Sequence, residues 1–206
     1  MAVVVGSGIA ARRLSPDDVG LQLLENSIAT ALGLAVLIFM LSPVSGAHFN
    51  PVVTIVDRIL SREPRWTAPA AYVVVQVGGA LLANAMFGLP PAMATTHRVS
   101  AGHLLGEVVA TAVLVLLIFS LVRTGRSAYV APAVGAYIGA AYWFTSSTSF
   151  ANPTVTVGRV FSDTFAGIAP DSVLPYVAAQ FVGTALGVGI LFALFPATST
   201  PLKGTK

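Results

Sequence analysis

Four long apolar stretches constrain the fold of this chain more than any other feature of its sequence. Each reaches the roughly 20 residues that a helix needs to cross a bilayer. A fifth is shorter. With 55% hydrophobic residues, 9% charged residues and a mean hydropathy of +0.83, the chain falls in the membrane class. We therefore expect an all-α membrane protein. The five stretches cover residues 21–42, 69–89, 103–122, 130–145 and 173–195.

The second half of the chain repeats the first. NPVVTIVDR, which starts at Asn50, aligns with NPTVTVGRV, which starts at Asn152. AAYVVVQVGGALL at 70–82 aligns in the same way with LPYVAAQFVGTAL at 174–186. The offset is 102 residues at the first match and 104 at the second, which indicates a duplicated unit.

The two units differ at their starts. Repeat 2, residues 103–196, contains three helical stretches and an Asn-Pro segment, whereas repeat 1, residues 1–89, opens with only a short apolar piece at residues 2–11. We expect one membrane domain on a six-helix plan, in which the chain begins inside the first transmembrane helix and ends in a tail at 197–206. Three helices per unit predict two repeats of opposite orientation, an arrangement that places functional sites near the bilayer midplane.

Each Asn-Pro pair predicts the start of a short helix, because Pro is favoured at the first helical position and Asn directly before it. The apolar segments after Pro51 and Pro153 run nine and eight residues, roughly 12 to 14 Å or half a bilayer. Two such re-entrant half-helices would meet near the bilayer centre, with Asn50 and Asn152 facing one path. The amide N–H groups of the two Asn side chains would donate hydrogen bonds to a passing solute, and the dipoles of both half-helices would repel cations. The pattern predicts a pore for small neutral hydroxylated molecules.

These motifs resemble the aquaporin and aquaglyceroporin family of major intrinsic proteins, whose signature is a pair of Asn-Pro-Ala boxes. SGAHFNP at 45–51 is highly specific, and Val52 and Thr154 replace the Ala of the two boxes. The resemblance covers nearly the whole chain. It implies a passive channel for water and small neutral solutes, and four side-by-side pores in a homotetramer. It also implies that Glu107 accepts hydrogen bonds from the loop that enters the second half-helix.

The outer constriction departs most from the family. Counting by the family's spacing from Asn50 and Asn152, the four residues of the selectivity filter are Thr30, Ala140, Ser149 and Val155. Val155 stands where the family has an arginine. Small side chains at these positions predict a wide, weakly polar filter. This filter resembles that of aquaglyceroporins found with arsenic-resistance systems, which adds arsenous acid to glycerol-like polyols as an expected solute.

Two interpretations of Arg159 stay open. It follows Val155 by four residues, so its guanidinium could line the outer vestibule about one turn above the usual place of the arginine. Alternatively, it forms an i, i+4 ion pair with Asp163 on a wetted surface. Glu25 and Asn26 are expected to flank the second helix at the membrane interface.

Several polar residues are expected to have structural rather than chemical roles. His48 would donate a hydrogen bond within its loop, and Gln76 and Gln180 would satisfy backbone groups beside the half-helices. His97 and His103 lie in another loop, so zinc-ligand spacing is missing, and the sequence contains no cysteine. No nucleophile, base and orienting group converge, so we expect neither an enzyme nor a bound metal or cofactor.

The loop charges predict the orientation. By the positive-inside rule, the C-terminus is cytoplasmic and the chain is a multi-pass protein of the plasma (inner) membrane. The basic residues form no stripe, which argues against a nucleic-acid partner. The cytoplasmic side would hold Arg58, Arg62, Arg65, Arg123, Arg126, Lys203 and Lys206, and the other side Arg12, Arg13, Arg98 and Arg159.

Two other functions stay open. Inverted repeats also occur in ion-coupled secondary transporters, which need titratable groups inside the membrane, and Glu107 is almost the only candidate. The incomplete first helix also leaves open a non-conducting structural membrane protein or fragment.

Overall fold

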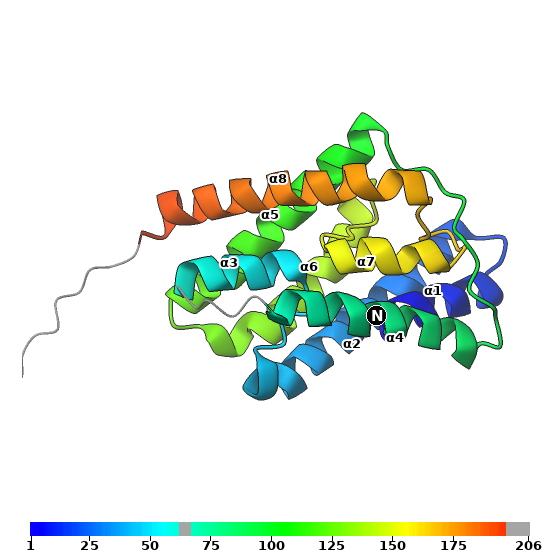
Figure 1. The fold of residues 1–206 in the computed structure, drawn as a ribbon, viewed down its shortest axis with the longest axis horizontal. Helices are drawn as coiled ribbons and strands as arrows, with labels where there is room; N and C mark the ends of the chain where they lie inside the picture. The colour runs from blue at the N-terminus through cyan, green and yellow to red at the C-terminus, as the bar shows by residue number, and fades with distance from the viewer. Residues whose placement is uncertain (62–66, 197–206) are drawn as a thin grey trace, which may run out of the picture.

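The computed structural model describes residues 1–61 and 67–196, with residues 67–71 described by their backbone only. Regular structure in this part of the chain is helical (Figure 1). The expected tail at 197–206, with Lys203 and Lys206, and the loop residues Arg62 and Arg65 lie outside the described residues. The elements are α1 (Ala2–Leu14), α2 (Val19–Ser45), α3 (Pro51–Ser61), α4 (Thr67–Met86), α5 (Ala101–Arg123), η1 (Ser127–Tyr129), α6 (Val130–Phe144), α7 (Pro153–Gly158), η2 (Arg159–Phe161) and α8 (Pro170–Leu194).

Three helices, α2, α5 and α8, are long and apolar enough to cross a membrane, with 27, 23 and 25 residues. Helix α4 has 20 residues, and its stretch Tyr72–Met86 is apolar. Large apolar side chains on these helices face outward, including Leu32 at 65% and Phe39 at 75% exposure on α2. Such a surface suits lipid rather than water. The expected all-α membrane protein is therefore confirmed.

Local sequence signals explain where the long helices begin and end. The Asp18 side chain accepts a hydrogen bond from the Leu21 backbone N–H at 2.9 Å, and Ser100 caps α5 in the same way through the His103 N–H at 3.2 Å. Side-chain oxygens at these positions satisfy backbone donors that the first helical turn leaves free. Helix α2 ends at Ser45, and the next residue, Gly46, caps it with a left-handed φ of 76°.

Glycines bring the long helices into backbone contact. A Cβ atom on Gly187 of α8 would lie 2.5 Å from the carbonyl oxygen of Ala112 on α5, and Gly183, one turn earlier, meets Val108 in the same way. Gly135 on α6 packs equally closely on the backbone of α2, at 2.5 Å. Small residues at four-residue spacing allow such close crossings in membrane helices. These close contacts set the relative positions of α5 and α8, and of α2 and α6, around the centre of the molecule.

Two short helices, α3 and α7, lie end to end in the middle of the molecule and extend to opposite sides (Figure 1). They start at Pro51 and Pro153, directly after the two Asn residues, and we call them the half-helices. Helix α7 has only 6 residues, and the 3₁₀ turn η2 continues it to Phe161.

The loops that lead into the half-helices share one backbone conformation. Ala47 and Phe49 both have a positive φ of 47° in the first loop. Ser149 and Ala151 have φ values of 48° and 47° at the matching positions of the second. Left-handed backbone is uncommon for residues other than glycine, so its occurrence at equivalent places indicates that the duplication extends to the backbone.

Helix α1 packs between α2 and α4. Its Val5 and Ile9 form a buried cluster with Ala80 and Ala83 of α4. On the α2 side, the Asn26 amide donates to the Val4 carbonyl oxygen at 3.0 Å. The short apolar start of the chain is thus a docked helix.

Candidate functional site

The two half-helices are joined by a reciprocal pair of hydrogen bonds. The Asn50 amide nitrogen donates to the Ala151 carbonyl oxygen at 2.7 Å, and the Asn152 amide nitrogen donates to the Phe49 carbonyl oxygen at 2.8 Å. Each Asn therefore binds the residue that directly precedes the other Asn. The junction is symmetrical, as the sequence repeat would require.

Each Asn also caps its own half-helix. The Asn50 side-chain oxygen accepts from the Val52 N–H at 3.2 Å, and the Asn152 oxygen accepts from the N–H groups of Thr154 at 2.9 Å and Val155 at 3.4 Å. A carboxamide has two N–H donors. Within the described chain each Asn nitrogen contacts one acceptor, so the second N–H of each amide is available.

Glu107 holds the second loop. Its carboxylate accepts from the backbone N–H groups of Phe150 and Ala151, both at 2.9 Å, and it is fully buried. Gln180 donates to the same carboxylate at 2.7 Å and to the Thr156 hydroxyl at 2.9 Å. One buried cluster thus connects α5, α8, α7 and the loop before it.

The first loop is held differently. Gln76 of α4 donates to the Phe49 carbonyl oxygen at 2.8 Å, and Tyr72 contacts the Phe49 ring edge-on at 6.3 Å. His48 lines the central cavity, but its side chain makes no hydrogen bond among the residues that the structure describes. The hydrogen bond expected of His48 within the loop is therefore not found there.

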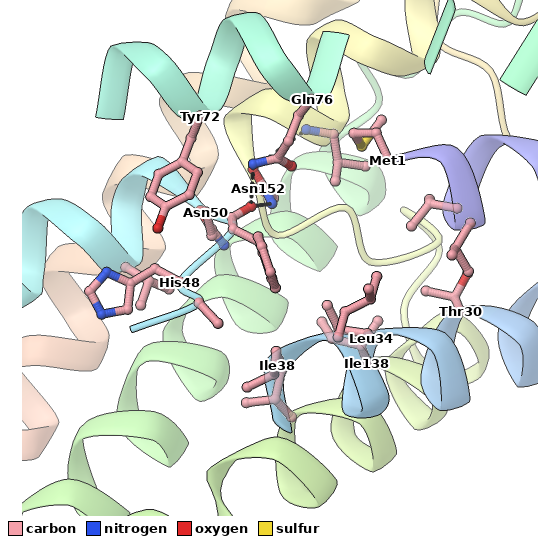
Figure 2. Close-up of a pocket in the computed structure, with 18 of the residues that line it drawn as sticks. Met1, Thr30, Leu34, Ile38, His48, Asn50, Tyr72, Gln76, Ile138 and Asn152 are labelled. Atoms are coloured by element: carbon pink, nitrogen blue, oxygen red, sulfur yellow. Dashed lines mark hydrogen bonds between the residues drawn. The ribbon is translucent and has the colours of Figure 1, made fainter. Parts of the chain in front are cut away.

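A cavity of about 660 Å³ surrounds the junction. Both Asn residues line it, and in Figure 2 they lie between His48 at one end of the view and Thr30 at the other. Most of the remaining lining is apolar, with contributions from α1, α2, α4, α5 and α6. A few polar groups in an apolar wall are typical of a site for small molecules.

The structure brings three of the four predicted filter positions to the cavity and leaves one outside. Thr30, Ser149 and Val155 line it, whereas Ala140 is exposed elsewhere on α6. The residues that α6 presents to the cavity recur every four positions and end at Tyr142, so Ala140 lies on another face. The family's count of twelve residues assumes its loop length, but here Tyr142 lies ten residues before Asn152.

Arg159 is buried, with 2% of its surface exposed. Its guanidinium donates to the Tyr142 hydroxyl at 2.7 Å, the Ala166 carbonyl oxygen at 3.0 Å and the Asn26 side-chain oxygen at 3.4 Å. The surface ion pair with Asp163 is therefore wrong. Helix α7 lies inside the bundle, so the residue that follows it meets buried groups rather than solvent.

Asn26 and Tyr142, which bind Arg159, make further hydrogen bonds of their own. Asn26 is fully buried within α2, and its amide nitrogen donates to the Ser7 hydroxyl at 2.7 Å, so the expectation that it flanks this helix is wrong. The Tyr142 hydroxyl lies 3.3 Å from the Thr30 hydroxyl. Hydrogen bonds thus connect α1, α2, α6 and η2 at one end of the cavity.

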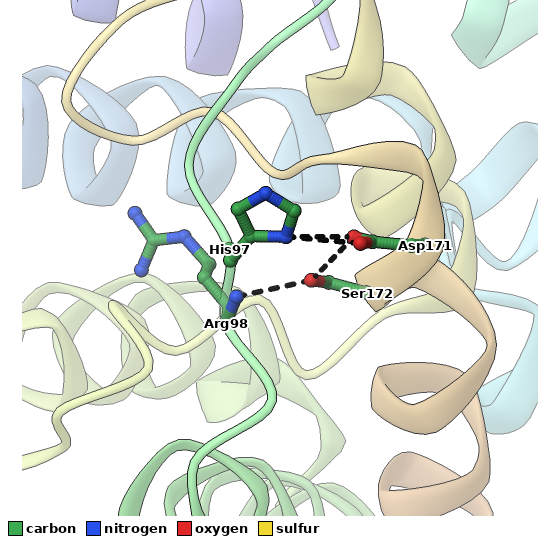
Figure 3. Close-up of polar contacts among 4 residues, drawn as sticks. All are labelled: His97, Arg98, Asp171 and Ser172. Atoms are coloured by element: carbon green, nitrogen blue, oxygen red, sulfur yellow. Dashed lines mark hydrogen bonds and ion pairs between the residues drawn. The ribbon is translucent and has the colours of Figure 1, made fainter.

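A buried arginine in the loop before α5 was not predicted. Arg98 is 4% exposed and donates to the carbonyl oxygens of Gly167 and Phe165, both at 2.7 Å. Its backbone N–H donates to the Ser172 hydroxyl at 3.0 Å, beside the contact between His97 and Asp171 (Figure 3). This loop is therefore fastened to the start of α8. An isolated arginine in a connecting loop carries no sequence signal that separates it from a surface charge.

Metal binding finds no support in the part of the chain that the structure describes. There, His, Asp and Glu side chains do not gather in groups of three or more that could hold an ion.

Helices of membrane length, half-helices that meet at an Asn pair and a cavity at their junction define a membrane channel. The family model for "Major intrinsic protein" matches residues 1–150. The chain belongs to this family of aquaporin-type channels, which confirms the resemblance seen in the sequence and the expectation that it is not an enzyme.

Three relatives illustrate the family. The chain is 45% identical to "Aquaglyceroporin AqpS" of Rhizobium meliloti (strain 1021) over 196 residues, 93% of this chain and 83% of that protein. It is 32% identical to "Probable aquaporin TIP5-1" of Oryza sativa subsp. japonica over 103 residues, 49% of this chain and 35% of that protein. Identity to "Probable aquaporin NIP-type" of Nicotiana alata is 29% over 180 residues, 82% of this chain and 64% of that protein.

Proposed function

We propose that this chain is a passive channel for water and small neutral solutes, namely glycerol-like polyols and arsenous acid. The observation that carries the proposal is the Asn pair at the junction. Asn50 and Asn152 line the cavity, and each keeps one N–H donor beyond those that hold the half-helices together. Two convergent donors in an apolar wall can replace part of a hydroxylated solute's hydration shell.

The three predicted filter residues that line the cavity support solutes larger than water. Val155 lines the cavity where the family has an arginine, and Thr30 and Ser149 are also small. The Ser149 hydroxyl is buried without a hydrogen-bond partner in the described chain, so it can serve a passing solute. A relative whose printed name is aquaglyceroporin, 45% identical over 196 residues, supports polyols further.

Passive conduction is favoured over ion coupling. A coupled transporter needs a titratable group that is free to exchange its proton or ion along the path. Glu107 is the buried carboxylate of the described chain, and three N–H donors from Phe150, Ala151 and Gln180 occupy it. It therefore serves the second loop rather than transport.

The architecture of the proposed channel follows the sequence repeat. Repeat 1 (1–89) and repeat 2 (103–196) would form one domain, with α3 and α7 re-entering the membrane from opposite faces. We further propose a homotetramer in the plasma (inner) membrane with a cytoplasmic C-terminus. Arg12, Arg13, Arg98 and Arg159 would then lie toward the outer side.

Proteoliposome swelling tests the function. Vesicles that contain the full chain should swell in inward gradients of glycerol and of arsenous acid faster than protein-free vesicles, at rates that rise linearly with the gradient. Saturable flux, or flux that follows a proton gradient, would overturn the passive channel in favour of a coupled transporter. Rates equal to those of protein-free vesicles would show a non-conducting protein.

A further inference from the structure

The cavity ends at a cluster of polar groups around Tyr142. Tyr142 and Thr30 line the cavity, and their hydroxyls lie 3.3 Å apart. Arg159 lies behind them and binds the Tyr142 hydroxyl at 2.7 Å. It does not itself line the cavity, and neither does any later residue up to the end of the described chain. A solute that passes this end must therefore move past Tyr142 and Thr30.

The position of Arg159 complements the substitution at Val155. The two residues are four apart on α7 and its continuation η2, so they lie about 6 Å apart along the axis on nearly the same face. Val155 has no polar group that could fill the space it faces. The longer arginine side chain reaches Tyr142 on α6, which is 17 residues away in sequence and does line the cavity.

Buried positive charge exceeds buried negative charge near this end. The Arg159 guanidinium lies 5.0 Å from the centre of the Phe150 ring, and that of Arg98 lies 5.5 Å from the same ring. Phe150 lines the cavity. Glu107 is the third buried charged side chain of the described chain, and N–H donors already surround its oxygens.

We propose that Arg159, held by Tyr142, is the residue that excludes cations from this channel. It acts from behind the cavity wall, so it raises the electrostatic barrier without narrowing the path for neutral solutes. This inference rests on the proposed function, because it assigns a specificity-determining residue to the same pore.

The geometry sets the size of the effect. The guanidinium carbon lies 6.0 Å from the centre of the Tyr142 ring, and a cation in contact with the cavity side of that ring would lie up to about 4 Å beyond it. At an effective dielectric constant of about 20, a unit charge about 6 to 10 Å away slows the passage of a cation about 15- to 100-fold. Neutral solutes do not experience this barrier.

The test measures cation and glycerol flux in the same proteoliposomes. Arg159→Gln removes the charge and keeps hydrogen-bonding groups, whereas Arg159→Lys keeps the charge. Arg13→Gln is a matched control, because Arg13 also donates to a carbonyl oxygen, that of Phe87 at 2.7 Å, and lies 5.2 Å from an aromatic ring centre, but is exposed. Potential-driven Na⁺ uptake is divided by glycerol flux, which corrects for the number of active channels.

We expect this ratio to rise about 10- to 100-fold in Arg159→Gln, and to stay within threefold of wild type in Arg159→Lys and Arg13→Gln. An unchanged ratio in a glycerol-conducting Arg159→Gln protein would overturn the inference and leave the proposed function intact. Absence of glycerol flux in the wild type would overturn the proposed function instead.

A second variant keeps the inference testable if Arg159→Gln does not fold. Thr30→Asp places a carboxylate beside Tyr142 and neutralises the local charge while Arg159 stays in place. The ratio of Na⁺ to glycerol flux should then rise at least tenfold. A ratio equal to that of the wild type would count against Arg159 as the cation barrier.

Discussion

The substitution Glu107→Gln should destabilise the protein far more than its size suggests. The carboxylate of Glu107 accepts three hydrogen bonds, from the N–H groups of Phe150 and Ala151 and from Gln180. A glutamine presents one oxygen and one NH₂ group, so at least one donor faces another donor. Leaving a buried donor unpaired costs about 1–3 kcal/mol.

The remaining bonds also weaken. Hydrogen bonds to a charged acceptor are about twice as strong as neutral ones, so the two bonds that glutamine keeps lose about 1 kcal/mol each. Glutamine avoids the cost of burying a charge, but three converging donors outweigh that gain. We expect the free energy of unfolding to fall by about 3–5 kcal/mol, which corresponds to a Tm lower by about 6–20 °C for a chain of this size.

Thermal unfolding in detergent measures this effect, and Glu25→Gln is the matched control. Glu25 also lies on a long helix, but it is half-buried and its described contact is one hydrogen bond, from the Ser15 hydroxyl at 2.9 Å. Its substitution should lower the free energy of unfolding by less than about 1 kcal/mol. A Tm for Glu107→Gln equal to or above that of Glu25→Gln would refute the reasoning.

Three further predictions concern the packing and the cavity. Gly187→Val should lower Tm by at least about 4 °C, because a Cβ atom at this position would lie 2.5 Å from a carbonyl oxygen of α5. Gly189→Val on the same helix is the control: a Cβ atom there meets nothing within 4 Å, so Tm should change little. Val155→Arg places a guanidinium on the cavity wall and should lower glycerol flux at least tenfold while water flux falls less. Stopped-flow light scattering measures both fluxes. Equal losses of glycerol and water flux would contradict a role of position 155 in selecting solutes by size. Ala140→Phe should leave glycerol flux unchanged because Ala140 faces away from the cavity, whereas Ile138→Phe should reduce the flux because Ile138 lines it. A loss of flux in Ala140→Phe but not in Ile138→Phe would show that the other face of α6 lines the cavity.

The junction of the half-helices could be predicted from sequence because its determinants are local. An Asn before a Pro specifies a helix start, and the same motif in register in a repeat predicts two such starts that face each other. The structure shows the two residues, Asn50 and Asn152, bound to each other's loops. The long helices could also be predicted, because an apolar run long enough to cross a bilayer has few stable conformations other than a helix.

The end of the cavity near Arg159 could not be predicted, because it depends on contacts between distant segments. Asn26 and Arg159 are separated by 133 residues, and no local pattern couples them. Tyr142 was missed because a count along the chain assumes a fixed loop length, whereas the face of α6 that meets the cavity is set by packing. The burial of Arg98 likewise follows from how its loop packs against the loop that contains Phe165 and Gly167.

The reciprocal bonds between the two loops also set an order for biogenesis. The Asn50 side chain needs the carbonyl group of Ala151, which the ribosome adds about 100 residues later, roughly 5 to 20 s at usual rates of synthesis. Until then, Gln76 of the same repeat can donate to the Phe49 carbonyl oxygen, but the Asn50 amide lacks the acceptor that Ala151 provides. The path through the membrane is therefore assembled last, only after both halves of the chain have been inserted.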